Sequence, residues 1–244
     1  MSAERTAAVE ASPMLDLCAD AHVHTGFSAG RDSVGVVVMA ADRAGLTALT
    51  FADQAGPDST WLPAYGDSVR RAQQRTDIRL SVAAEIEIIR ADGWLAWPPD
   101  LGGLDAITVS LSRLPLAAGP ATPQQVRGLL AAGSVRRADV IERAVEATVR
   151  GVERASRYAP ARLSRPLSLL NQIGIVEEEI DAHLLTHLVE GCRVTHATVE
   201  VSEAWRTPSA TLVRRLLESG VTVSAASDAR YAAQVGRWQY VAGL

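Results

Sequence analysis

The sequence contains no lysine, since all 24 of its basic residues are arginine. A lysine amine is needed for a pyridoxal-phosphate Schiff base, a lysine-based aldolase and a Walker A nucleotide site, so these classes of protein are excluded. Only two cysteines occur, Cys18 and Cys192, and they form no C-x-x-C pair. This argues against a disulfide scaffold, a thiolate zinc site and an iron–sulfur cluster. Any metal ion must therefore be held by histidine and carboxylate side chains.

Long hydrophobic runs and clusters of positive charge are also missing. The longest apolar stretch, 34–41, is too short to span a bilayer, and residues 1–14 lack the apolar core of a signal peptide. A net charge of −4 and a pI near 5.8 offer no general attraction for nucleic acid. We expect a cytoplasmic protein that binds neither membranes nor nucleic acids. Residues 1–14 are expected to be a flexible N-terminal extension, and residues 15–244 a single domain.

Apolar runs with β-strand character alternate with helical stretches along the chain. Gly45 and Gly220 follow two of these stretches and are of the residue type that commonly terminates a helix. Strands that alternate with helices predict parallel strands joined by crossovers, in a barrel-like α/β fold or in a doubly wound open sheet. Segments 98–99 and 115–123 are expected to be loops. The seven candidate strands are Leu17–His22, Ala48–Asp53, Leu80–Ile89, Ala106–Leu111, Thr198–Val201, Val221–Ala226 and a weaker one ending near 163–164.

His22 and His24 stand at the end of the first candidate strand, in Asp20-Ala-His-Val-His-Thr. Side chains two residues apart on a strand point the same way, so both imidazoles can converge on one metal ion. Barrels of this class place their active sites at the carboxyl ends of the strands. The motif therefore predicts a metal site there, with two unrelated strand-end histidines as the structural alternative.

Carboxylates occur near the ends of three other candidate strands, at Asp53, at Glu85 and Glu87, and at Asp228. A metal ion bound by imidazole commonly completes its shell with carboxylates. Glu85 and Asp228 are therefore expected to be ligands. Because Glu85 and Glu87 share one face of their strand, the spacing alone leaves both acids open.

Together these motifs resemble the polymerase-and-histidinol-phosphatase (PHP) family over 17–238, nearly the whole chain. The resemblance implies a distorted, TIM-like (β/α)7 barrel with up to three metal ions at its mouth, often zinc, iron or manganese, that hydrolyses phosphate esters. The similar motifs are Asp20-Ala-His-Val-His-Thr with Ser28, Asp53-Gln54, Ala84-Glu85, Glu200-Val-Ser, Ser227-Asp228-Ala-Arg and Val235-Gly-Arg-Trp238.

The resemblance assigns a first metal site to four residues: His22, His24, Glu85 and Asp228. Other metal-ligand histidines of the family are replaced here, by Gln54, by Arg230, by Arg165 of Arg165-Pro166 and in the segment 111–113. The resemblance therefore implies a reduced site with one divalent ion, which is zinc, manganese or iron.

We expect a metal-dependent, phosphoesterase-like hydrolase that acts on a small anionic metabolite. Arginine is permanently cationic and binds phosphate or carboxylate in a bidentate manner, so Arg165 and Arg230 are expected to clamp the anionic group. Asp53 and Gln54 are expected to position the attacking water or the substrate. Two alternatives stay open. One is a non-catalytic PHP-like binding or scaffold protein whose arginines form structural ion pairs, and the other is a repurposed enzyme of specialised metabolism with non-phosphoesterase chemistry.

Two further motifs have competing interpretations. The segment 26–30 fits the G-x-S-x-G pattern of serine hydrolases, but too little chain precedes it for that fold, so Ser28 is expected to belong with the histidine motif. His183 and His187 share a helical face and could bind zinc. Because this helix is expected outside the barrel, a solvated or crevice-lining pair is the preferred interpretation.

Overall fold

Seven parallel strands form one sheet in the computed structural model, which describes residues 15–244. The expected extension at 1–14 lies outside the described residues. Strand order in the sheet follows the chain, because each strand pairs in parallel with the next one. Within 15–244, no helix combines the length and apolar composition needed to cross a membrane. The strands are β1 (Ala19–Val23), β2 (Ala48–Ala55), β3 (Arg79–Glu87), β4 (Ala106–Ser110), β7 (Ala161–Leu163), β8 (Thr198–Ser202) and β9 (Val223–Ala226).

The end of β9 returns to β1 and closes the sheet. The amide of Asp228 donates to the carbonyl of His22, and the amide of His24 donates to the carbonyl of Ala229, each at 2.9 Å. Val23 and Ala229 form a parallel bridge at the same place. The expectation of a (β/α)7 barrel is thereby confirmed, and the alternative of an open doubly wound sheet is wrong.

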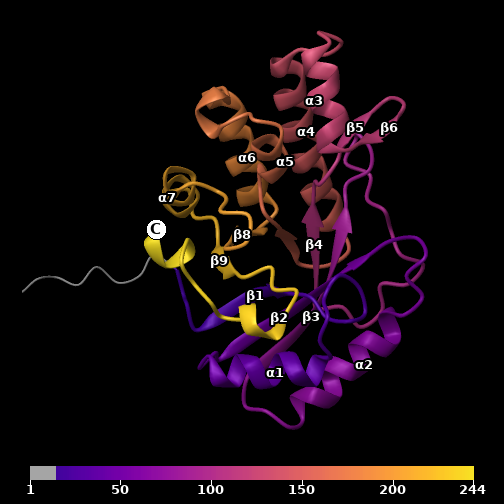
Figure 1. Ribbon diagram of the computed structural model, residues 1–244, viewed down its shortest axis with the longest axis vertical. Helices are drawn as coiled ribbons and strands as arrows, with labels where there is room; N and C mark the ends of the chain where they lie inside the picture. The colour runs from indigo at the N-terminus through magenta and orange to yellow at the C-terminus, as the bar shows by residue number, and fades with distance from the viewer. Residues whose placement is uncertain (1–14) are drawn as a thin grey trace, which may run out of the picture.

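Helices surround the strands, with α1 and α2 beside β1 to β3 and with α4 to α6 on the opposite side (Figure 1). Their ends follow local rules: the Ser33 hydroxyl caps α1, and Gly45, with φ of 74°, follows its last turn. The helices are α1 (Val34–Arg43), α2 (Leu62–Gln73), α3 (Pro123–Ala131), α4 (Arg137–Ala155), α5 (Ser168–Gln172), α6 (Ala182–Val194) and α7 (Ala210–Glu218), with short 3-10 turns at Glu177–Glu179, Ala232–Gln234 and Val241–Gly243.

The segment 115–123, expected to be a loop, contains an antiparallel hairpin and the start of α3. Strands β5 (Leu114–Leu116) and β6 (Gly119–Ala121) pair so that Pro115 faces Pro120. Proline is tolerated because each strand has only one neighbour and needs few amide donors. The prolines are the reason that the sequence pattern predicted a loop here and not this short pair of strands, which is separate from the barrel sheet.

Alternation along the strands separates an apolar outer layer from a polar barrel interior. In β3, Val82 and Ile86 belong to the main apolar core beneath the helices. Ala83 lies on the other face, in a small cluster with Ala52 and Ala106. These three alanines lie in register on neighbouring strands, two residues before Glu85 on the β3 side. Buried polar and charged side chains of the strands gather beyond them, at the carboxyl ends.

Candidate metal centre

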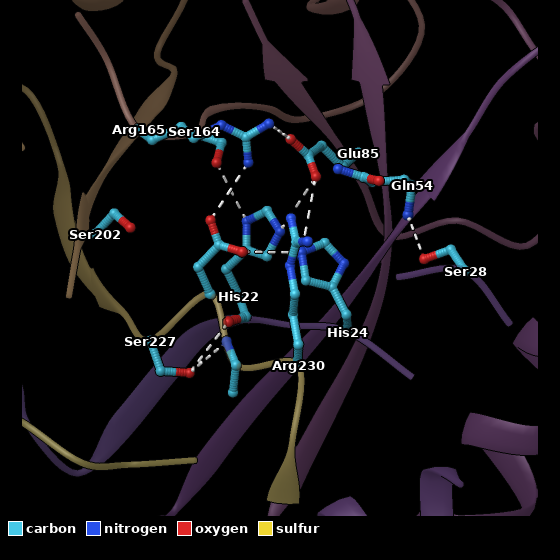
Figure 2. Close-up of polar contacts among 12 residues, drawn as sticks. His22, His24, Ser28, Gln54, Glu85, Ser164, Arg165, Ser202, Ser227 and Arg230 are labelled. Carbon is cyan, nitrogen blue, oxygen red and sulfur yellow. Dashed lines mark hydrogen bonds and ion pairs between the residues drawn. The ribbon is translucent and has the colours of Figure 1, made fainter. Parts of the chain in front are cut away.

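His22 and His24 project from the carboxyl end of β1 as two buried imidazoles. Their ring centroids lie 4.8 Å apart. The Oε2 atom of Glu85, on β3, lies 3.7 Å from Nε2 of His22 and 3.8 Å from Nε2 of His24. Figure 2 shows the two rings side by side beneath the Glu85 carboxylate. One ligand atom from each of these three residues lies within 4.8 Å of the others, a grouping that could hold a metal ion.

Asp228 joins this cluster from the segment that follows β9. Its φ of 54° and the hydrogen bond from its backbone N–H to the His22 carbonyl turn the carboxylate over the barrel mouth. Oδ1 lies 3.0 Å from His24 Nε2, and Oδ2 accepts a hydrogen bond from the Trp205 indole at 2.7 Å. Burial alone raises the pKa of Asp228, but the bond to His24 and the nearby cations outweigh burial and hold the pKa below its usual range. The group is therefore an ionised carboxylate, as a metal ligand must be.

Glu200, which sequence reasoning left without a role, is the partner of His22 inside the barrel. Its Oε2 lies 2.7 Å from His22 Nδ1, and its Oε1 accepts from Arg162 Nε at 2.8 Å. Burial lowers the pKa of His22, yet the charges of Glu200, Asp228 and Glu85 outweigh it and raise that pKa to about 9. A signal was available in the sequence, because Arg162 and Glu200 are charged residues within short strands whose neighbouring positions are apolar.

Arg165 occupies the space between the two acidic residues of the cluster. Its φ is 37°, and its side chain is only 3% exposed. NH2 lies 2.5 Å from Glu85 Oε1, and NH1 lies 3.3 Å from Asp228 Oδ2. NH2 also donates to the Ser112 hydroxyl at 2.9 Å, and the guanidinium lies 5.3 Å from the Trp205 ring. Arg165 was expected to hold a substrate anion, whereas in this structure it contacts the protein's own carboxylates.

The choice between Glu85 and Glu87, which the spacing left open, is decided by their contacts. Glu87 Oε1 accepts hydrogen bonds from the amides of Ser112 and Arg113 at 2.9 and 3.0 Å, so it fixes the loop after β4. Glu85 alone approaches both histidines. Burial raises the pKa of Glu85, but the opposing charges of Arg165, His22 and His24 prevail and lower it.

The donor set of this cluster fits a divalent metal ion. Glu85 Oε1 is paired with Arg165, but His22 Nε2 and Glu85 Oε2 are buried and have no hydrogen-bond partner among residues 15–244. Buried polar atoms without partners are rare in folded proteins and point to a missing partner such as a metal ion or water. Two imidazoles with carboxylates form a ligand set that zinc, manganese and iron accept.

Asp53 and Gln54 alternate in direction at the end of β2. Asp53 is fully buried, and its oxygens accept from the Thr25 amide (2.9 Å), the Thr25 hydroxyl (2.6 Å) and the Ser28 hydroxyl (2.5 Å). Gln54 is exposed, and Figure 2 shows its side chain directed toward Glu85. The Ser28 hydroxyl therefore donates to the Asp53 carboxylate and accepts from the backbone N–H of Gln54. Within the described part of the chain it is not hydrogen-bonded to a histidine, as the nucleophile of a serine hydrolase would be.

The remaining candidates lie at the rim or on the outer helices. Arg230 is exposed, and in the view of Figure 2 its side chain extends across the two histidine rings. His183 and His187 lie on α6, where His187 pairs with Glu146 of α4 at 3.3 Å. Among residues 15–244, the only group of three or more potential metal ligands is the one formed by His22, His24 and Glu85.

Comparison with known proteins finds solved structures with a similar fold. No family model matches the chain, and no curated protein matches it. Its structure is similar to that of a histidinol phosphate phosphatase from Lactococcus lactis, solved with zinc, L-histidinol and phosphate, with a TM-score of 0.65 and 14% identity over 92% of this chain and 89% of the other. It is also similar to a candidate histidinol phosphatase from Listeria monocytogenes, with a TM-score of 0.64 and 14% identity over 90% and 97% of the two chains. At this identity the likeness establishes the fold.

Proposed function

We propose that this chain is a PHP-like hydrolase that binds one divalent metal ion through His22, His24, Glu85 and Asp228 and acts on a small anionic substrate, with a phosphate ester as the first choice. The observation that carries the proposal is the meeting of two buried imidazoles with one buried oxygen of Glu85, Oε2, which lies 3.7 and 3.8 Å from their Nε2 atoms and makes no hydrogen bond to the described residues. The similar fold of a phosphatase solved with zinc and phosphate supports the same reaction class. Bound zinc, manganese or iron would supply Lewis acidity and lower the pKa of a water molecule.

Side chains of this chain would orient the centre and receive the substrate. Glu200 holds His22 through Nδ1, which leaves Nε2 directed at Glu85. Trp205 holds Asp228 over the mouth in the same way. Arg230 is an exposed cation at the rim, and we assign to it the contact with the anionic group of the substrate.

Asp53 would act as a positioning residue, since both of its oxygens are engaged by Thr25 and Ser28. Through Ser28 it fixes the backbone of Gln54, whose exposed amide remains free to orient water or substrate. In this proposal Asp53 acts indirectly, by positioning the loop and the Gln54 backbone, whereas Gln54 contacts the water or substrate at the barrel mouth.

A non-catalytic binding protein with the same fold is the second candidate. It is favoured by one observation: the side chains of Glu85, Asp228 and Arg165 are at most 3% exposed and pair with one another. Such a closed centre would leave little room for a substrate at the ion.

Metal content and phosphate release test both candidates. The protein is produced under metal-replete conditions, and bound metal per chain is measured for the wild type, for His24→Gln and for the control His183→Gln on α6. Phosphate release is then measured on a panel of phosphate monoesters that includes histidinol phosphate. We expect one ion per chain in the wild type and in His183→Gln, none in His24→Gln, and metal-dependent release of phosphate. A wild type with no bound ion would overturn the proposal. One ion without turnover would establish the binding protein instead.

A further inference from the structure

Each acid of the candidate metal centre presents one oxygen to the histidines and the other to Arg165. The inner oxygens, Glu85 Oε2 and Asp228 Oδ1, lie 3.8 and 3.0 Å from His24 Nε2. The outer oxygens, Glu85 Oε1 and Asp228 Oδ2, lie 2.5 and 3.3 Å from the Arg165 guanidinium. Arg165 therefore bridges the same two carboxylates that the proposed function assigns to the metal ion, from their opposite side.

The position of Arg165 is built by its surroundings. The Ser112 hydroxyl accepts from NH2, and the Trp205 ring lies under the guanidinium while its indole N–H holds Asp228. The residue adopts a left-handed backbone conformation, with φ of 37°, in the segment that leaves β7. A buried arginine that is fixed on three sides has little freedom to turn outward toward a substrate.

We infer that Arg165 is the internal counter-cation of the candidate metal centre: it orients Glu85 and Asp228 through their outer oxygens, and its charge weakens the binding of a divalent ion at their inner oxygens. This inference rests on the proposed function. It assigns Arg165 a positioning role and leaves Arg230 as the arginine available to the substrate.

Two opposing effects follow from Arg165, and their sizes decide the expected result. Orientation of the carboxylates favours metal binding by reducing the ordering that binding requires. A fixed positive charge within a few ångströms of a divalent ion opposes binding through direct repulsion, which is little screened in a buried site. Because repulsion between close charges in such a site is the larger effect, removal of the charge should tighten metal binding.

The test compares metal affinities of chelator-treated proteins by titration calorimetry with Zn²⁺ and with Mn²⁺ at one fixed pH. Arg165→Gln removes the charge but keeps an amide that can bond to Ser112. We expect its dissociation constant to fall at least about ten-fold. Arg70→Gln is the matched control, since Arg70 lies on α2 and pairs with Asp105 in an exposed ion pair. Its metal affinity should stay within about two-fold of the wild type.

A milder variant keeps the test decisive if Arg165→Gln does not fold. Ser112→Ala removes one hydrogen bond from the charged guanidinium, which is then less firmly held beside the carboxylates, so metal binding should tighten by at least about two-fold. Equal or weaker binding by both variants, with metal still bound by the wild type, overturns the counter-cation role alone. Absence of binding in all the proteins overturns the proposed function and this inference with it.

Discussion

Removal of the Glu200 carboxylate tests whether the barrel interior is organised around ion pairs. Glu200 is fully buried and contacts His22 Nδ1 at 2.7 Å and Arg162 Nε at 2.8 Å. Replacement by alanine leaves Arg162, which is 16% exposed, and His22 without their acidic partner. Breaking a buried ion pair from one side costs about 3–5 kcal/mol. Since Arg162 retains some contact with water, we expect Glu200→Ala to cost about 3 kcal/mol, the lower end of that range.

Replacement of Glu200 by glutamine separates the effect of the charge on stability from the effect of the side-chain shape. Glu200→Gln keeps an acceptor for Arg162 but loses the charge of the hydrogen bonds to both partners, so it should cost about 1.5–3 kcal/mol. The control is Glu190→Gln on α6, where the same chemical change affects an exposed pair with Arg193 and should cost at most about 0.5 kcal/mol.

The free energy of unfolding is measured for each of these variants by urea denaturation, with similar m-values as the condition for comparison. The double variant Glu200→Gln with Arg162→Gln should show a coupling energy above about 1 kcal/mol. If Glu200→Ala lowers the free energy of unfolding by less than about 1 kcal/mol, the reasoning is refuted, because Arg162 and His22 would then not depend on the buried carboxylate for their stability.

Three further predictions concern the thiols and the loops near the centre. Burial raises the pKa of Cys192 to about 12, so iodoacetamide at pH 8 should modify only the exposed Cys18 in the native protein and both thiols in denaturant, as read by mass spectrometry. Asp53→Ala removes the acceptor of three hydrogen bonds and should cost about 3 kcal/mol, while Asp53→Asn should cost less, as read from urea denaturation. Gly30→Ala places a Cβ 2.6 Å from the backbone of His24 and should lower stability by about 1–3 kcal/mol, whereas Gly35→Ala in α1, with open space around it, should raise stability by about 0.5–1 kcal/mol; the reverse order of melting temperatures would contradict this.

Most of the barrel could be predicted from the sequence because its strands are short apolar runs separated by helices with clear ends. Closure of the sheet was expected only from the PHP resemblance and could not be derived from the strand and helix pattern, since the hydrogen bonds that close the sheet join His22 and His24 to residues about 200 positions later, Asp228 and Ala229. Local patterns carry no information on such a pairing. The hairpin at 114–121 was also missed, because proline argues against strands in general and only a two-stranded pair tolerates it there.

The candidate site shows the same division between local and distant information. Strand parity and strand ends indicated His22, His24, Glu85 and Asp228, and the structure brings these four together. The sequence could not indicate where the Arg165 side chain points. That direction depends on the left-handed backbone conformation of Arg165, which follows the three-residue strand β7. The role of Glu200 depends on Arg162 and His22, which lie on two other strands, so this role could not be predicted from the position of Glu200 in its own strand.

The charges of the buried cluster bear on the proposal that it binds a metal ion together with an anionic substrate. Glu85, Glu200 and Asp228 carry three negative charges, and Arg162 and Arg165 supply two positive ones. One negative charge is left, and a buried unbalanced charge is costly. A proton on His22 balances it, which agrees with the raised pKa of that histidine. A divalent ion in place of the proton would leave one positive charge, and this charge is what an anionic substrate near Arg230 would neutralise.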